Sequence, residues 1–209
     1  YTVENYMANS TNHFEKAAES LFNVINAAHP LSNEAIAYIK EKIQLLQISK
    51  GSLLVTAGQH CDHLYFVGKG VLRGYVKQDS KDITTWITAE NELVTSISSY
   101  YQQIPSIENI EALEDCILLS IHRSDMQFMY DHFPEVNILV RILLEKYYQD
   151  AEERAYICRL TDATAKYHRF INTKSHLLNR IPLKFVASFL GMTLETLSRI
   201  RGRLSNVRV

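Results

Sequence analysis

The residues best suited to chemistry lie near the C-terminus, in the stretch IPLKFVASFLGMTLETLSRIRGRL, residues 181–204. Hydroxyl, carboxylate and guanidinium groups gather in its second half, and these groups suit contacts with the base edges and phosphates of a nucleic acid. The side chains that we expect to make such contacts are Thr193, Glu195, Thr196, Ser198, Arg199, Arg201, Arg203 and Lys184.

Their expected roles differ by chemistry. The guanidinium fork of Arg199 matches O6 and N7 of guanine, and the carboxylate of Glu195 is an acceptor for a cytosine amino group. Hydroxyls such as that of Ser198 suit either phosphates or bases. The remaining cations, Arg201, Arg203, Lys184 and Arg180, suit phosphates.

These side chains need two short helices joined by a sharp turn. Pro182 suits the first position of a helix, because its missing N–H costs nothing there. Gly191 suits the left-handed residue that ends this helix, and Thr193 is a good N-cap for the next one. The residues expected to face inward are Val186, Ala187, Leu190, Leu194, Leu197 and Ile200. This spacing predicts a helix-turn-helix, although an ordinary helical hairpin with a basic solvated face is the alternative.

The charge of the chain is divided unevenly between its two parts. Residues 1–150 hold 11 Lys and Arg against 19 Asp and Glu, a net charge of −8. Residues 151–209 hold 11 Lys and Arg against 4 Asp and Glu, a net charge of +7, and the two sum to −1. An acidic body with a basic C-terminal module indicates that the module alone binds a polyanion.

The three cysteines argue against a disulfide framework. Cys61, Cys116 and Cys158 are scattered and form no CxxC pair, which favours a reducing cytoplasm and offers no zinc or iron–sulfur ligand set. No apolar run approaches the roughly 20 residues that span a bilayer, and no signal-peptide pattern is found, so we expect no membrane partner. The sequence begins at Tyr1, and we expect the natural start to lie upstream.

The first part of the chain predicts an α+β fold. Residues 1–12 are polar and expected to be loosely held, after which helices are predicted over Phe14–Ala28 and, capped by Ser32, over residues 32–46. From about Gln47 to Ser120, glycines separate short period-two runs: SLLVT, HLYFV, VLRGYV, ITTWIT and CILLSI. Such spacing predicts an antiparallel β-roll or barrel. A short helix over residues 124–133 follows.

A long helix is predicted from about Glu135 to Arg159. One apolar face is expected to cover the β-region, and a second, near-heptad stripe predicts a homodimer seam. The seam residues are Val140, Leu144, Tyr147, Ala151, Ala155 and Cys158. Burial of this helix in the core of a single chain is the alternative.

This order of elements resembles the Crp/Fnr family of bacterial transcription regulators, most specifically in GSLLVTAGQHCDHLYFVGKG and ASFLGMTLETLSRIRGRL. The resemblance implies a cyclic-nucleotide-binding-like double-stranded β-roll (jelly roll) with its N-terminal helices over residues 1–133. It further implies a dimerisation helix over 134–160 and an all-α, winged-helix-like helix-turn-helix domain over 161–209. The implied partners are double-stranded DNA, a second copy of the chain and, as a candidate, RNA polymerase, all in the bacterial cytoplasm.

The sequence departs from the family at several positions. The recognition helix has Leu194 where the family pattern begins with Arg, and only SNVRV follows Leu204, where the family has a β-hairpin wing. In the phosphate-binding stretch, Asn91 replaces Gly, and Pro105 with Ser106 stands where an Arg-Ser pair is expected. Since Pro supplies neither charge nor an N–H donor, we expect cyclic AMP binding to be lost. The candidate effector-pocket residues are Glu92, Leu93, Pro105, Ser106 and Tyr100.

Two alternatives remain from the sequence. One is a regulator switched by a different small-molecule effector bound in the roll. The other is a cupin-like metalloenzyme. His60 and His63 lack the further His and Glu ligands that such a site needs, and the carboxylates that cluster near the roll, Glu92, Glu108, Glu111, Glu114 and Asp115, are expected to form a solvated acidic face. We therefore expect no catalytic residues, no metal, no cofactor and no enzymatic activity.

Overall fold

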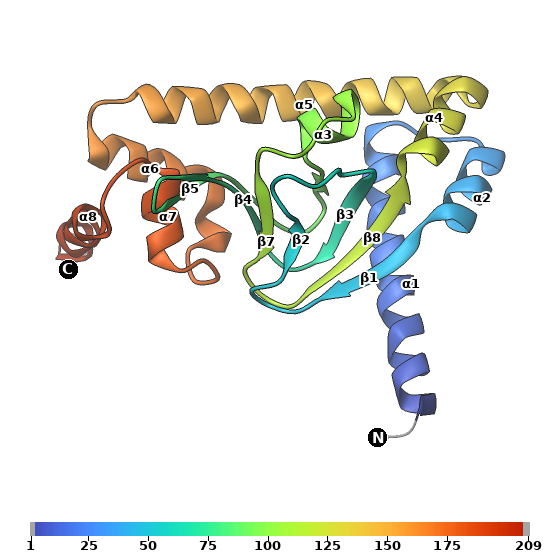
Figure 1. Ribbon diagram of the computed structural model, residues 1–209, viewed down its shortest axis with the longest axis horizontal. Helices are drawn as coiled ribbons and strands as arrows, with labels where there is room; N and C mark the ends of the chain where they lie inside the picture. Colours follow the sequence, from blue (N-terminus) through green and yellow to red (C-terminus); the bar gives the residue numbers. More distant parts are fainter. Residues whose placement is uncertain (1–2, 207–209) are drawn as a thin grey trace.

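The computed structural model describes residues 3–206 of the chain, with side chains described from residue 10 to residue 204. Figure 1 shows a β-roll in the middle, two N-terminal helices at one end and a group of short helices at the other. The N-terminal helices are α1 (Val3–Ala28) and α2 (Asn33–Lys42). The last helices are α6 (Ala163–Lys174), the 3-10 turn η1 (Ser175–Leu177), α7 (Leu183–Phe189) and α8 (Leu194–Asn206).

The roll consists of two four-stranded antiparallel sheets, as the period-two runs predict. One sheet has the order β1 (Gln44–Ile48), β8 (Cys116–His122), β3 (His63–Lys69), β6 (Leu93–Val94). The other has the order β2 (Leu53–Val55), β7 (Asn109–Ala112), β4 (Leu72–Gln78), β5 (Lys81–Thr88). A short helix, α3 (Ile97–Gln102), follows β6. Buried apolar residues such as Val67, Leu72 and Leu118 fill the space between the sheets.

Two of the sequence predictions are wrong near the N-terminus. The second helix ends at Lys42, and residues expected to continue it form β1, because Leu45 and Leu46 pair with Leu119 and Leu118 of β8. Pairing with a distant strand has overridden the local helical period. Residues 3–12 are helical rather than loose, since a helix already nucleated by packing extends at small cost. Tyr1 and Thr2 lie outside the described residues.

The predicted long helix is confirmed as α5 (Pro134–Arg159), preceded by the short helix α4 (Arg123–His132). Pro134 occupies its first turn, where no N–H is needed. It runs along one side of the molecule, from α4 at one end to the C-terminal helices at the other (Figure 1). Val136 and Leu139 are buried against the roll and α1. Among the described helices, none is long and apolar enough to cross a bilayer.

The predicted turn between α7 and α8 is confirmed. Gly191 has φ +63°, Met192 N–H donates to Ala187 C=O at 3.0 Å, and Gly191 N–H donates to Ser188 C=O at 3.1 Å, which together cap the end of α7. Pro182 lies one position ahead of the helix rather than at its first residue. Leu194, expected to face inward, is 46% exposed, because it lies in the first turn of α8, ahead of the buried Leu197 and Ile200.

One apolar core joins the roll to the C-terminal helices. Val71, Ile87 and Leu113 of the roll pack in the same cluster as Phe170 of α6 and Val186 of α7. The C-terminal helices are therefore docked on the roll of their own chain. The domain boundaries at residues 133 and 160 stay predictions.

An ion-pair cluster borders this core. Arg180, between η1 and α7, donates to both oxygens of Glu90, at 2.6 and 2.9 Å, and also pairs with Glu114. Gly70 N–H donates to Glu90 at 2.8 Å. Partial burial raises the pKa of Glu90, but the hydrogen bonds from Arg180 and Gly70 outweigh it and hold this pKa at about 2.

This depressed pKa predicts a pH-dependent contribution to stability. Because the folded-state pKa of Glu90 lies below its ordinary 4.5, the contribution is complete above pH 4.5 and is lost as pH falls through 2. Glu90→Gln should lower the free energy of unfolding by about 1 kcal/mol at pH 6, since the pair is partly exposed. The difference should shrink as pH falls below 4.5, when measured by urea unfolding at successive pH values. A difference that stays constant from pH 6 to pH 3 would contradict this role.

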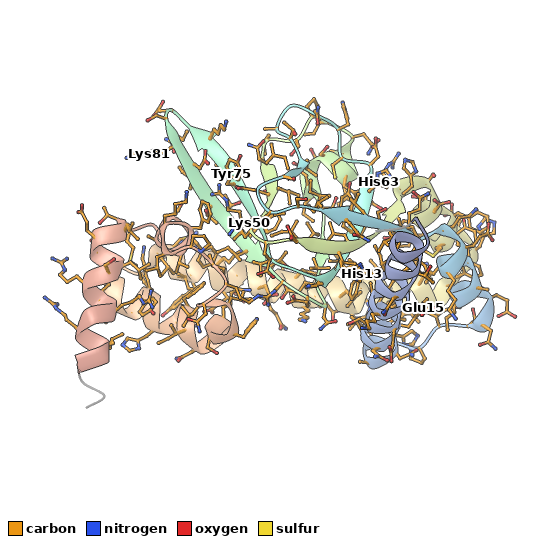
Figure 2. All side chains as sticks on the ribbon, turned by 90° about the horizontal axis from the view of Figure 1, so that it is seen from below. His13, Glu15, Lys50, His63, Tyr75 and Lys81 are labelled. Atoms are coloured by element: carbon orange, nitrogen blue, oxygen red, sulfur yellow. The ribbon has the colours of Figure 1, made fainter. Side chains whose placement is uncertain are left out.

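The matched control is Glu15→Gln. Figure 2 labels Glu15 on α1, distant from the C-terminal helices, and its side chain is exposed. No comparable pH-dependent difference is expected for this variant.

Candidate functional site

The outer face of α8 carries most of the residues singled out for nucleic-acid contact. Glu195, Ser198, Arg199 and Arg203 are exposed, while Thr196 and Arg201 are half-buried. The opposite face is buried through Leu197 and Ile200. In Figure 2, nitrogen-tipped side chains stand out from α8 at the end of the molecule. The amphipathic pattern thus leaves a polar, basic helix face directed at solvent.

Local hydrogen bonds fix how α8 begins. The Thr193 hydroxyl accepts from Thr196 N–H at 3.1 Å, which confirms the predicted N-cap. Lys166 of α6, a residue that the sequence did not single out, donates to Leu190 C=O at 3.2 Å and to Cys158 C=O at 3.3 Å. A cation at two helix C-termini is electrostatically favourable and ties the turn before α8 to the end of α5.

The other two candidate phosphate contacts differ from each other. Lys184 is exposed, with Nζ 4.7 Å from the centre of the Phe185 ring. Arg180, in contrast, is engaged by Glu90 and Glu114 of the roll. Only Lys184 of the two therefore adds to the exposed basic surface beside α8.

A groove of about 1330 Å³ lies between the roll and α5. Of the five candidate pocket residues, Glu92 and Leu93 line it, whereas Pro105, Ser106 and Tyr100 do not. Its polar and aromatic lining comes from both sides and includes Trp86, Thr88, Tyr101, Tyr130, Tyr147 and Arg154. Ile97 and Tyr101 of α3 line this groove together with residues of α5.

The segment expected to correspond to the family's phosphate-binding stretch begins at Asn91, which keeps the backbone conformation that glycine would give. Asn91 has φ +67°, in the left-handed region that Asn tolerates, and its N–H donates to Val67 C=O at 2.9 Å. The Glu92 carboxylate accepts from the Thr88 hydroxyl. Leu93 N–H donates to the Tyr147 hydroxyl of α5 at 2.5 Å. Replacement of Gly by Asn91 therefore leaves the turn intact, and these polar groups are satisfied within the chain.

The end of this segment, at Pro105 and Ser106, departs further from the family pattern than its start at Asn91 does. Ser106 is 3% exposed, and its backbone N–H donates to Gln59 C=O at 2.8 Å. Its hydroxyl lies 2.9 Å from that of Ser96 and 2.8 Å from Glu108 C=O. Pro105 has no N–H, and no Lys or Arg occurs between Asp82 and His122. The stretch thus offers an anion neither a cation nor the Ser106 amide.

The side chains of Trp86 and Glu108, near the groove, are hydrogen-bonded to each other. Trp86 Nε1–H donates to Glu108 at 2.8 Å, and burial raises the pKa of Glu108 despite this bond.

Tyr100 is 2% exposed, and its hydroxyl has no hydrogen-bond partner among the described residues. Of the tyrosine pair, Tyr101 rather than Tyr100 faces the groove. The side on which each lies depends on the short helix α3, which the sequence did not predict.

The predicted seam residues of α5 fall on two sides. Leu144, Ala151, Ala155 and Cys158 are exposed, and Val140 is half-buried. Tyr147 instead contacts β6 of its own chain. The exposed large apolar side chains of α5 are Ile138, Leu144, Tyr148 and Tyr156, of which only Leu144 was singled out from the sequence. Strict alternation of four- and three-residue steps from Leu144 would have selected Tyr148 in place of Tyr147.

The histidines form no metal site in the described part of the chain. His63 lies edge-on to His122, with ring centres 5.0 Å apart, and His60 belongs to no cluster with them. Across the residues whose side chains are described, no group of three His, Cys, Asp or Glu side chains is placed to hold a metal ion.

Comparison with known proteins agrees with this architecture. Residues 45–133 match the family model described as the cyclic nucleotide-binding domain. FixK2 from Bradyrhizobium japonicum superposes with a TM-score of 0.69 at 15% identity, over 80% of this chain and 86% of that one. CLP, a c-di-GMP responsive global regulator from Xanthomonas campestris, gives 0.63 at 15% identity, over 84% and 92%.

The catabolite activator protein of Thermus thermophilus gives a TM-score of 0.52 at 20% identity, over 87% of each chain. No curated protein matches the sequence. The chain therefore contains a cyclic nucleotide-binding-type domain over residues 45–133 and, over most of its length, has a fold like those of FixK2, CLP and the catabolite activator protein.

Proposed function

We propose that this protein is a sequence-specific, DNA-binding transcription regulator that acts as a homodimer in the bacterial cytoplasm. The observation that carries the proposal is α8, which is capped by Thr193, buried through Leu197 and Ile200, and exposed along a face with Arg199 and Arg203. Those side chains suit a helix inserted in the major groove. The likeness in fold to regulators such as FixK2 supports the proposal.

A second copy of the chain is the partner that α5 fits best. Its exposed apolar side chains include Tyr148, 73% exposed, and Leu144, 47% exposed, along a helix of 26 residues. Two chains paired along α5 would carry two α8 helices, which would enter successive major grooves about 34 Å apart on a near-palindromic site. RNA polymerase is a further proposed partner in transcription.

The cyclic nucleotide-type pocket is proposed not to bind cyclic AMP. A buried phosphate without a paired cation is costly, and the stretch between Asp82 and His122 supplies no Lys or Arg. The Ser106 amide is already bonded to Gln59. A different effector is the second candidate, supported by the size of the groove and by its aromatic lining. Nothing in this arrangement favours enzymatic chemistry.

The dimer proposal predicts the effect of a charge on α5. Tyr148→Glu should shift sedimentation equilibrium towards the monomer by at least about tenfold in the dimer dissociation constant, because an unpaired carboxylate would be buried between the two helices. Ile107→Glu, at a side chain 71% exposed on the roll, is the matched control and should leave the constant unchanged. Equal behaviour of the two variants would argue against α5 as the seam.

The DNA-binding proposal predicts that two arginines of α8 contribute differently to DNA binding. On a duplex recovered from random sequence by binding, Arg199→Ala should weaken specific binding by about 1–3 kcal/mol and relax specificity at one position. Arg203→Ala should weaken binding to all sequences alike and lower the salt slope by about 1. Fluorescence anisotropy across a salt series measures both quantities. Unchanged affinity and specificity in Arg199→Ala would exclude its role in reading a base.

A further inference from the structure

The C-terminal helices are joined to the rest of the chain by one covalent connection. The segment between α5 and α6 covers only residues 160–162. A rigid group held by one short connector can swivel about it, so its orientation depends on further contacts. α7 makes such contacts with the roll, and with β5 in particular.

The first contact is the guanidinium fork of Arg180. It donates to Glu90 at 2.6 and 2.9 Å and to Glu114, where its Nε–H lies 3.4 Å from the carboxylate. Glu90 comes from the segment between β5 and β6, and Glu114 from the segment between β7 and β8. Bidentate pairing fixes direction as well as distance, because both oxygens of Glu90 are held in the plane of the guanidinium.

The second contact joins α7 to the β4–β5 hairpin. The Ser188 hydroxyl accepts from Thr84 N–H at 2.9 Å and donates to Asp82 C=O at 3.1 Å. One side chain thus takes the place of a neighbouring strand for two backbone groups of β5. Figure 1 shows α7 beside β5. Ser188 and Thr84 are 104 residues apart in the sequence, so no local sequence pattern marks this contact.

The third contact is a buried stack. Arg73 of β4 is 3% exposed, and its guanidinium lies 3.7 Å from the centre of the Phe185 ring on one side and 4.2 Å from that of Tyr75. Glu111 and Asp82 pair with it, at 2.6 and 3.3 Å. Arginine suits this site because a planar guanidinium can stack on rings while its edge donates to carboxylates.

We propose that these three contacts form a clamp that sets the orientation of α7 and α8 on the roll, so that its members are positioning residues for DNA recognition. The clamp consists of Arg180, Phe185 and Ser188 on the C-terminal side, and of Arg73, Glu90, Glu114 and β5 on the roll. The inference rests on the proposed DNA-binding function. Three separate points of attachment are the smallest number that fixes a rigid body in space.

The clamp also borders the groove. Glu90 lies between Thr88 and Glu92, and both of these residues line the groove. An occupant that moved Glu92 would therefore move the segment that holds Arg180. The clamp would in this way connect the position of α8 to the groove, although no residue of α8 lines it.

The first test variants open the clamp but keep every basic residue. Glu90→Gln with Glu114→Gln neutralises the partners of Arg180, and Ser188→Ala removes the hairpin contact. Arg180→Ala opens the same contact from the other side. Arg169→Ala is the matched control, because it removes a cation of α6 whose partner, Glu153, lies on α5 rather than on the roll.

Two measurements are made on the full-length protein. Hydrogen–deuterium exchange should rise roughly tenfold over residues 175–190 in the clamp variants and not in Arg169→Ala, as the loss of one charge-assisted bond implies. Affinity for a duplex with two half-sites should fall by a similar factor in the double Gln variant, whereas affinity for a single half-site and the salt slope should not change.

Several outcomes would overturn the clamp. Unchanged exchange over residues 175–190 excludes it, and raised exchange with unchanged two-half-site affinity excludes a positioning role. A lower salt slope in Arg180→Ala, with no effect of the double Gln variant, would make Arg180 a phosphate contact instead. If neither the wild type nor any variant binds DNA, the proposed function fails. The exchange measurement alone then decides whether the clamp exists.

Discussion

The apolar core shared by the roll and the C-terminal helices is the constraint on which the rest of the structure depends. Leu113 of the roll and Leu190, directly after α7, belong to one buried cluster, to which Leu197 of α8 also contributes. Because this core takes the inward face of α8, the basic outward face is left to solvent. The same docking brings Arg180 within reach of two carboxylates, so that burial holds the C-terminal helices on the roll and the proposed clamp sets their orientation there.

The distribution of charge follows the same division. The segment from Asp82 to His122 has no Lys or Arg, and two of its carboxylates, Glu90 and Glu114, pair with Arg180 ahead of α7. In a phosphate-binding site, a cation and free amides converge on one point. Here the Ser106 amide is bonded within the roll, and Arg73 and Arg180 take part in the contact between the roll and α7.

The sequence was sufficient where a local pattern determines the structure. The period-two runs identified five strands, and Ala187, Gly191 and Leu197 identified the turn between α7 and α8. Short strands such as β6 and β7 were missed, since their pairing partners are distant and their length leaves no period. Arg180 was assigned to phosphate for a similar reason: its partners lie 66 and 90 residues away, and no local signal marks them. The side on which Tyr100 lies depends on α3, a helix of only 6 residues.

The central claim is that a dimer of this chain reads DNA without a cyclic nucleotide. Its most direct test is selection of binding sites from random duplex DNA by the full-length protein, with and without cyclic AMP, at one near-physiological salt concentration. The account predicts enrichment of two inverted half-sites about one helical turn apart, identical in both conditions. Enrichment that appears only with cyclic AMP, or no enrichment in either condition, would contradict it.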